Sequence, residues 1–371
     1  MNNKAYKVAV FPYDYESFPI IKYRNELEKF EVVKIFSLKG WGGVGKGALE
    51  IGKDDSKDEL IVQDIFDDLK TDQFDTLWLV ESEHTLEDSF LFECIEKMVE
   101  NKIKLFISRK LTKDQLMRIK EICKKEKVHT LLTEEEDEYF ADGDEQIYNL
   151  YTPVISIAGI GQKANKMELQ LEVYSRLKQD GYQVCWIASR KEAVLFGGET
   201  FPQFMIESSL SEKDKILKYN HYLKLLEQER KPDVFLIGIP GGIMPITKRH
   251  VGNFGIYAYE IFNAVTPDFT IVSLYYSSFK KEYLEELEKL MKYKFSVEVD
   301  CFNVSNIEQD AFSMGSILPI EYVLWENKEL KDKIEEIEAG EFPLFNRMTY
   351  ESMYQYMIEQ LNGYDELKEI Y

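Results

Sequence analysis

The chain has 371 residues, of which 44% are hydrophobic and 13% aromatic, enough to bury a large core and to favour two domains. Its 46 basic and 67 acidic residues give a formal net charge of −21, which argues against nucleic acids and membranes as general partners. No apolar run approaches the ~20 residues that span a bilayer, and the N-terminus enters a strand directly, so we expect a cytoplasmic protein.

The four cysteines lie far apart, with no Cys-x-x-Cys pair and no histidine at ligand spacing. This pattern disfavours a zinc or iron–sulfur site, and the sequence predicts no metal centre. We expect the thiols to be reduced and buried as small hydrophobic groups. They are Cys94, Cys123, Cys185 and Cys301.

Strand-like and helical patterns alternate through residues 1–133, which predicts a Rossmann-like or flavodoxin-like domain with a parallel sheet. The expected strands cover residues 6–11, 32–38, 76–80, 105–107 and 128–132, and the expected helices residues 20–30, 86–99 and 113–125. Ligands of such sheets bind beyond the carboxyl ends of the strands, so the loops after Leu38 and Val80 are candidate site loops.

The loop after Leu38 is rich in glycine. Gly40, Gly45 and Lys46 have the Gly-x4-Gly-Lys spacing of a phosphate loop, with Gly43 between them. The following ALEIGKDD is unsuited to a helix, so the loop lacks the dipole that helps such loops to bind phosphate. Phosphate binding, contact with an anion or partner, and a flexible turn all stay open.

The loop after Val80 places Ser82 and Glu83 at a strand end before a helix. A position at the edge of a site and simple capping of the helix by Thr85 or a neighbour are both open.

Residues 134–151 form the expected boundary between the domains. Residues 134–145 contain eight acidic and no basic residues, which is typical of a solvated linker. A docking strip for a basic peptide is the alternative.

The second half begins with a strand, a glycine loop and a helix. Gly159 and Gly161 follow an apolar β-branched run, and helical spacing then continues to a stop at Gly181. Such a loop can turn its N–H groups towards an anion at the positive end of the helix. Lys166 stands where a phosphate-binding lysine would, with Lys163 and Asn165 before it, and the site predicts binding of a nucleotide or another anion.

The rest of the second half predicts another α/β domain at 152–304 and a helical C-terminal extension at 305–371. The expected strands cover residues 154–157, 183–188, 234–238, 270–274 and 295–302, with an extended piece at 320–325. The expected helices after the first lie at 213–230, around 257–265, and at 281–293, 328–338 and 350–361.

Three further places are candidates for the same site. Arg190 at a strand end offers a guanidinium for phosphate or carboxylate, or forms a surface pair. Pro240, Gly241 and Gly242 form a turn suited to a backbone-made pocket, or a purely structural one. Glu260 could face the cleft, as could His250, although a lone histidine is more often structural.

The second half resembles the SIMIBI class of P-loop NTPases, especially its dethiobiotin-synthetase-like branch. Gly159 and Lys166 are spaced as in that branch, and Gly241 with Gly242 matches its Gly-Gly turn. Three of its positions differ: Asn165 replaces a glycine, Met167 replaces the hydroxyl ligand of Mg²⁺, and Gly238 replaces an acid. Phosphoryl transfer depends mainly on neutralising charge, so these departures predict poor catalysis.

Longer phrases resemble a clostridial family of peptide maturation system proteins found with bacteriocin-like ribosomal peptides. They are KGWGGVGKG, GIGQKANKMELQLEV, ASRKEAVLFGGETFPQFM and KPDVFLIGIPGGIMP, and the likeness spans about residues 5–330. It implies a ribosomal precursor peptide and co-encoded maturation enzymes as partners, and it carries no defined catalytic residues.

These observations predict an accessory protein of peptide maturation whose second domain binds ATP, another nucleotide or a different anion. The sequence does not determine which cofactor, if any, is bound. One alternative is an ATP-dependent ligase or kinase acting on a carboxylate, with Glu168 or Glu260 among its metal ligands. Another is a scaffold that presents the peptide to other enzymes.

Overall fold

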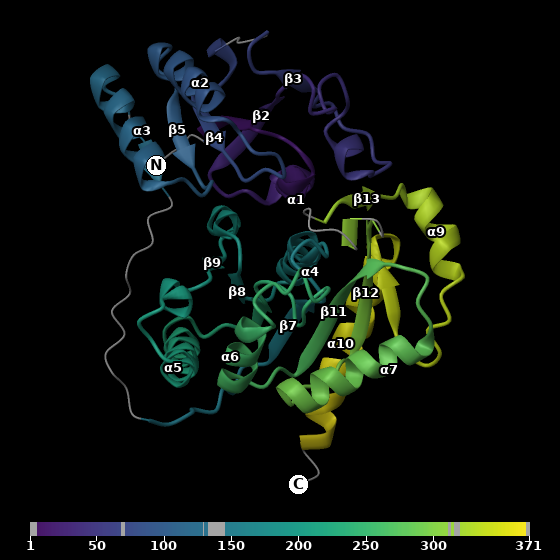
Figure 1. Cartoon of the computed structure of the whole chain (residues 1–371). Coiled ribbons are helices and arrows are strands. Elements are labelled where there is room, and N and C mark those ends of the chain that lie inside the picture. The colour runs from purple at the N-terminus through teal and green to yellow at the C-terminus, as the bar shows by residue number, and fades with distance from the viewer. Residues whose placement is uncertain are drawn as a thin grey trace. The chain divides into compact units, whose positions relative to one another are not determined.

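A computed structural model of the chain describes residues 6–67, 71–128, 130–132, 145–310, 313–314 and 320–368. The described residues form two compact units, one within Met1–Glu136 together with Val194–Gly197, the other within Asp137–Ala193 and Gly198–Tyr371. Each unit is an α/β layer with a mostly parallel sheet flanked by helices, and the chain ends in a long helix (Figure 1). The predicted fold class is confirmed.

The first unit contains a six-stranded sheet in the order β3-β2-β1-β4-β5-β6, with every neighbouring pair parallel. Its strands are β1 (Tyr6–Phe11), β2 (Phe30–Ser37), β3 (Val62–Asp64), β4 (Thr76–Leu79), β5 (Lys104–Ile107) and β6 (Thr130–Leu132). The chain moves outward from β1 in one direction and then from β4 in the other. The strand order therefore reverses between β1 and β4, where ligands of doubly wound sheets bind.

The helices of the first unit are α1 (Phe18–Lys22), α2 (Asp88–Glu100) and α3 (Lys113–Glu126). A capping box begins α3: the Thr112 side chain accepts from the Gln115 N–H, and the Gln115 side chain accepts from the Thr112 N–H. The buried faces of α2 and α3 pack with β1, β4 and β5 into one apolar core.

The predicted helix at 20–30 is wrong. Helix α1 ends at Lys22, a short 3-10 turn follows, and Phe30 opens β2 instead. The Phe30 ring lies 5.4 Å from the Phe106 ring and 6.2 Å from the Trp78 ring, centroid to centroid. Packing in the sheet thus overrides the helical spacing of this short stretch.

The second unit contains a sheet in the order β13-β12-β11-β7-β10-β8-β9, with β14 beside β12. Its strands are β7 (Val154–Gly159), β8 (Val184–Ala188), β9 (Glu199–Thr200), β10 (Val234–Gly238), β11 (Phe269–Tyr276), β12 (Cys301–Gln309), β13 (Tyr322–Leu324) and β14 (Leu344–Asn346). Among the described pairings only β13 runs antiparallel to its neighbour. Strand β7 lies centrally, between β10 and β11.

The helices of this unit are α4 (Lys166–Gln179), α5 (Glu212–Arg230), α6 (Ile256–Ala264), α7 (Lys281–Leu290), α9 (Asn327–Glu335) and α10 (Tyr350–Lys368). Helix α4 packs on β7, β8 and β10, and α10 packs on α4 and β11 (Figure 1). On α10, Tyr350, Tyr354 and Met357 lie at helical spacing and are buried, so this side of the helix packs in the core.

The predicted strand at 295–302 is displaced. Residues Met291–Phe295 continue α7 as a π-helical turn that buries Phe295, and β12 begins only at Cys301. The apolar residues read as a strand are instead the inner side of this turn and of the segment after it.

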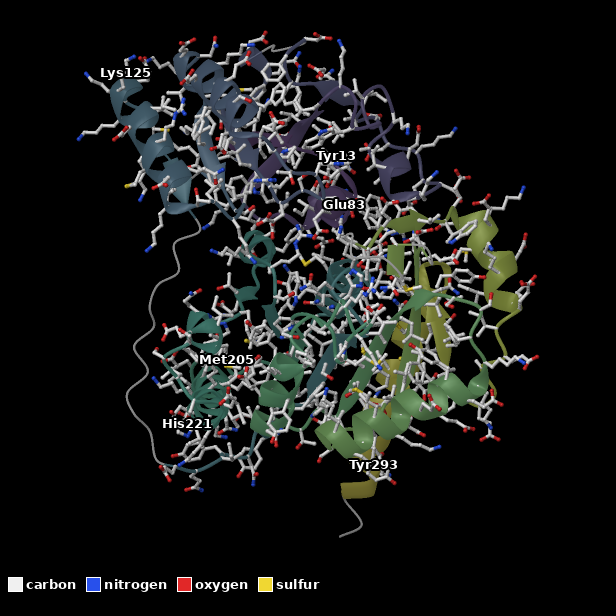
Figure 2. The ribbon with its side chains drawn as sticks, viewed as in Figure 1. Tyr13, Glu83, Lys125, Met205, His221 and Tyr293 are labelled. Carbon is white, nitrogen blue, oxygen red and sulfur yellow. The ribbon has the colours of Figure 1, made fainter. Side chains whose placement is uncertain are left out.

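Residues 145–151, the end of the predicted linker, run along α5. Asn220 exchanges hydrogen bonds with the backbone of Tyr148. His221, labelled on α5 in Figure 2, has its ring centroid 5.0 Å from that of Tyr148. The Glu227 carboxylate accepts from the N–H groups of Tyr151 and Thr152. The acidic residues 134–144 lie outside the described residues, and the proposed domain boundaries stay a prediction.

All four cysteines are buried and unbridged, as expected. Burial raises the pKa of the Cys94 and Cys301 thiols, and raises that of Cys185 to about 12. Among the described residues, no helix is long and apolar enough to cross a bilayer.

Candidate functional site

The glycine loop of residues 159–166 lies where the strand order of the second sheet reverses. It leaves the central strand β7 and enters α4, with the end of β10 on one side and the end of β11 on the other. The Ile160 N–H donates to the Ser273 carbonyl of β11, and the Ile243 N–H beyond β10 donates to the Gly159 carbonyl. Such a position is where open α/β sheets bind ligands.

Lys166, the first residue of α4, is buried, at 6% exposure. Its Nζ atom donates hydrogen bonds of 2.6 Å to the Gly161 carbonyl and 2.6 Å to the Gly241 carbonyl, with the Gln162 carbonyl at 3.5 Å. The ammonium thus joins the glycine loop to the turn after β10, next to the positive end of α4.

Asn165 has a backbone conformation that glycine adopts most readily. Its φ of 53° and ψ of 21° are left-handed, a region that asparagine tolerates better than most residues. Its amide donates a 2.8 Å hydrogen bond to the Asn306 side chain of β12. The departure from the Gly-Lys pattern therefore preserves the backbone and adds an anchor.

Three glycines allow the loops to approach each other closely. A Cβ on Gly159 would lie 3.0 Å from the Lys166 side chain, and one on Gly242 would lie 2.7 Å from the Ile160 carbonyl oxygen. A Cβ on Gly161 would lie 2.0 Å from the hydroxyl of Tyr275. The predicted residues Gly159, Gly161, Lys166, Gly241 and Gly242 therefore meet in one place.

Sequence reasoning missed the aromatic side of this site. Tyr275, near the end of β11, is 4% exposed beside the loop, and burial raises its pKa. Its ring lies 5.8 Å from that of Tyr322, and the Lys163 ammonium lies 5.1 Å from the Tyr322 ring centroid. Tyrosines spaced as ordinary strand residues gave no signal for this arrangement.

The positions that differ from the NTPases that the sequence resembles lie in a packed environment. A Cβ on Gly238 would lie 2.0 Å from the Gln170 side chain, which accepts from the Trp186 indole and donates to the Lys166 carbonyl. Met167 is buried. Among the described residues, no group of three His, Cys, Asp or Glu side chains could hold a metal ion.

Glu168, two residues after Lys166, forms a buried ion pair with Arg347. Their exposed side-chain fractions are 0% and 4%, and Arg347 Nη2 donates to Glu168 Oε2 over 2.6 Å. Glu260 on α6 is fully buried, 3.7 Å from the Lys215 ammonium, and burial raises its pKa. Both acids considered as metal ligands thus face basic side chains.

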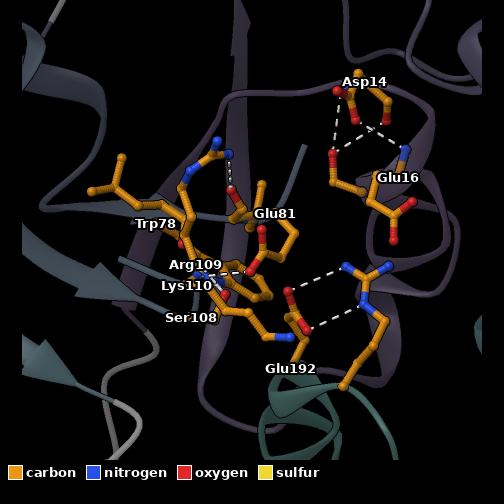
Figure 3. A network of polar contacts seen from close by, with 12 residues as sticks. Asp14, Glu16, Trp78, Glu81, Ser108, Arg109, Lys110 and Glu192 are labelled. Atoms are coloured by element: carbon orange, nitrogen blue, oxygen red, sulfur yellow. Dashed lines mark hydrogen bonds and ion pairs between the residues drawn. The ribbon is translucent and has the colours of Figure 1, made fainter. Parts of the chain in front are cut away.

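The other second-unit candidates are positioned as follows. Arg190 forms a two-point ion pair with Glu192, at 3.2 and 3.3 Å (Figure 3). Pro240 precedes Gly241, whose φ of 71° explains the glycine there. His250 lies 3.0 Å from the Thr247 hydroxyl through Nδ1. Anion binding by Arg190 stays a prediction.

In the first unit, the glycine loop after β2 is not followed directly by an α-helix. Its end instead forms backbone hydrogen bonds with the start of β3. Gly40, Gly42 and Gly45 have positive φ, and a Cβ on any of them would meet open space. The Gly45 N–H donates to the Val62 carbonyl, and the Val62 N–H donates to the Lys46 carbonyl. Gly43, whose Cβ would contact Ile51 and Val62, completes a turn without the helix that a phosphate loop requires.

Asp14, which sequence reasoning missed, connects the loops after β1 and β4. Its Oδ2 accepts from the Ser82 hydroxyl at 2.6 Å and the Glu83 N–H at 2.8 Å, and its Oδ1 accepts from the Glu16 N–H (Figure 3). Burial raises the Asp14 pKa despite these bonds. Ser82 and Glu83 therefore lie at the point where the strand order reverses; α2 starts at Asp88, so Thr85 is not its cap.

No family model and no curated protein sequence matches the chain. Among solved structures, it is similar to a DUF1611 family protein from Anabaena variabilis ATCC 29413, with a TM-score of 0.60, 10% identity, and coverage of 95% of this chain and 99% of that one. At this identity the likeness shows a shared fold across both units.

A second solved structure is chloroplast FtsY from Physcomitrella patens, with a TM-score of 0.28 and 14% identity over 60% of this chain and 75% of that one. This similarity is too low to carry an argument.

Proposed function

We propose that the second unit binds a phosphate-bearing ligand, with ATP or another nucleotide as the leading case, through Gly159, Gly161, Lys163 and Lys166. The observation that carries this proposal is the buried Lys166 ammonium, which Gly161 and Gly241 carbonyls hold at the N-terminal end of α4. A helix N-terminus and a fixed cation together favour an anion.

The same geometry supports binding without efficient phosphoryl transfer. Met167 stands where a hydroxyl ligand is expected, and Gln170 fills the space beside Gly238. A ligase or kinase would need other metal ligands, and both Glu168 and Glu260 lie beside basic side chains. We therefore favour an accessory role over an ATP-dependent enzyme.

The proposed setting is the maturation of a ribosomal peptide, with its precursor and co-encoded enzymes as partners. Support for it comes from the sequence phrases that resemble the peptide maturation system family. A cytoplasmic location belongs to the same proposal, and so does the exclusion of nucleic acids and membranes, which rests on the charge of −21.

Calorimetric titration with ATP, ADP and inorganic phosphate, with and without Mg²⁺, tests the binding. Lys166→Met keeps the aliphatic bulk but removes the charge, and should weaken binding at least about tenfold, the equivalent of 1.4 kcal/mol. Lys46→Met, in the other glycine loop, is the matched control and should bind as wild type. Circular dichroism verifies that both variants fold.

The reverse result, binding lost in Lys46→Met and kept in Lys166→Met, would move the site to the first unit. If no nucleotide or phosphate binds while the precursor peptide still does, the protein is a scaffold and the proposed ligand site is wrong.

A further inference from the structure

One segment of this acidic chain lacks acidic residues. Although 67 of the 371 residues are Asp or Glu, none occurs from Val234 to Tyr259. The same segment carries Lys248 and Arg249, both exposed, shortly before α6. The nearest acid on α6, Glu260, is fully buried and does not contribute to the surface. The side-chain charge of this segment is therefore positive, opposite in sign to that of the chain as a whole, although Glu212 on the neighbouring helix α5 acts on Glu260.

Large apolar side chains are exposed shortly after these cations in the sequence. The exposed fractions are 54% for Phe254, 44% for Ile256 and 45% for Tyr259. Ile256 and Tyr259 are three residues apart on α6 and share one side of the helix. Neighbouring exposed apolar side chains with polar surroundings are typical of a contact site for a partner.

The backbone presents Phe254 in an unusual conformation. Its φ is 59°, in the left-handed region that aromatic residues rarely adopt, and Gly252 and Gly255 on either side also have positive φ. The Lys294 ammonium fixes this turn by donating to the carbonyls of Phe254 at 2.7 Å and Ile243 at 3.0 Å. Backbone strain of this kind tends to occur at functional sites.

We propose that Lys248, Arg249, Phe254, Ile256 and Tyr259 form a docking face for an acidic peptide segment with apolar side chains. The proposal deepens the proposed function, since it rests on a peptide partner. At physiological salt, charges act over about 8 Å, so the peptide's carboxylates respond chiefly to charges close to the face, among them Lys248 and Arg249. The apolar side chains of the peptide cover the three exposed residues of the face.

One segment of the chain connects the docking face to the glycine loop site. The segment that ends in Phe254 begins with Gly241, which binds Lys166, and Ile243, which binds Gly159. Lys294 contacts both Ile243 and Phe254. A peptide held on this face would lie on the segment that also closes around Lys166.

Fluorescence anisotropy with a labelled synthetic helix of leucine, glutamate and alanine tests the proposal. The wild-type chain should bind this probe, and versions with lysine for glutamate, or serine for leucine, should bind at least about tenfold more weakly. Phe254→Ser with Ile256→Ser, and separately Lys248→Glu with Arg249→Glu, should each lower affinity about tenfold or more, as expected of central contact residues.

Matched controls come from the exposed side of α3. Met117, which is 58% exposed, provides Met117→Ser, and Lys120→Glu with Lys124→Glu repeats the charge change. These variants should bind the probe as wild type. The proposal fails if the probe with lysine in place of glutamate binds as well as the acidic probe. It also fails if the double charge reversals at Lys248 and Arg249 and at Lys120 and Lys124 change affinity for the acidic probe equally, or if the protein binds vesicles of anionic lipid and not the peptide.

Lys166→Met separates the two proposals. It should lose nucleotide and keep the peptide probe. If nucleotide never binds but the face variants still discriminate between probes, the docking face stands and the proposed nucleotide site falls.

Discussion

Arg347 and Glu168 form a buried ion pair across 179 positions of sequence. Glu168 lies in the first turn of α4, where an acid also interacts favourably with the helix dipole. Arg347 directly follows β14, the short strand that pairs with β12. The pair therefore attaches the C-terminal part of the chain to the helix that carries Lys166.

Arg347→Met should lower the free energy of unfolding by about 3–5 kcal/mol, because Glu168 would stay buried without this partner. Adding Glu168→Met should recover much of the loss. Urea unfolding measures both, with Lys102→Met as the control, since the exposed Lys102–Glu126 pair is screened by solvent and should contribute far less. A loss below about 1 kcal/mol in Arg347→Met would mean that the pair contributes little.

Asn165→Ala should be about 1 kcal/mol less stable than Asn165→Gly, because alanine strains the left-handed backbone that glycine accepts. Asn165→Gly should itself lose about 1 kcal/mol with the hydrogen bond to Asn306. The backbone of Lys231 is also left-handed, but no side-chain hydrogen bond like that of Asn165 is described for it. Lys231→Gly should therefore raise the free energy of unfolding slightly. Equal stability of Ala and Gly at 165 would show that the conformation is not a constraint.

Gly238→Ala should destabilise the second unit by about 1–3 kcal/mol, because its Cβ would overlap the Gln170 side chain. Combining it with Gln170→Ala should cost less than the sum of the single changes. Thermal unfolding of the three variants makes the comparison. Strict additivity would place the overlap elsewhere.

The isolated protein should hydrolyse Mg·ATP weakly or not at all, since neither glycine loop offers a hydroxyl ligand for Mg²⁺. Phosphate release from purified protein measures this rate. Turnover of order 1 per second or faster, abolished by Lys166→Ala, would reveal an ordinary enzyme and refute the accessory role.

Asp300 should make stability decrease as the pH rises. Burial raises its pKa from 3.8 to about 6, so the native state holds the proton more tightly than the unfolded chain. The benefit is complete below about pH 4 and is lost through pH 6. Between pH 4 and pH 6, the free energy of unfolding of Asp300→Asn should therefore rise by about 1–2 kcal/mol relative to that of wild type, after allowance for solvent screening.

Asp54 is the control of opposite sign. Burial raises its pKa, but the ion pair with Lys22 and bonds from Ser56 outweigh this and lower the pKa to about 2. The stabilisation by ionised Asp54 is present above pH 4 and is lost towards pH 2. The free energy of unfolding of Asp54→Asn should therefore become lower than that of wild type as the pH rises. If both variants showed the same trend in urea titrations at several pH values, the assignment to Asp300 would be wrong.

The alternation of strand and helix could be predicted because nearly continuous apolar runs, such as the one that ends at Gly159, are typical of buried parallel strands. Short elements could not: β3 and β14 have three residues each and depend on the neighbour that they pair with. The helix predicted at residues 20–30 was wrong for a related reason, since Phe30 packs against two aromatic rings distant in sequence.

The glycine loop could be predicted from its strand, glycines and helix, which are local features. Its surroundings could not, because Tyr275 and Arg347 reach it through strand order and not through spacing in the sequence. The same applies to Asp14, whose role depends on β1 and β4 being neighbours.

Strand β14 has a consequence for synthesis on the ribosome. Domains fold largely as units while the chain emerges, and every described strand of the first sheet precedes residue 133. In the second sheet, by contrast, β12 pairs with Leu344–Asn346, and Glu168 of α4 pairs with Arg347. The first sheet could thus form early, whereas the glycine loop gains its final support only after Arg347 has been synthesised.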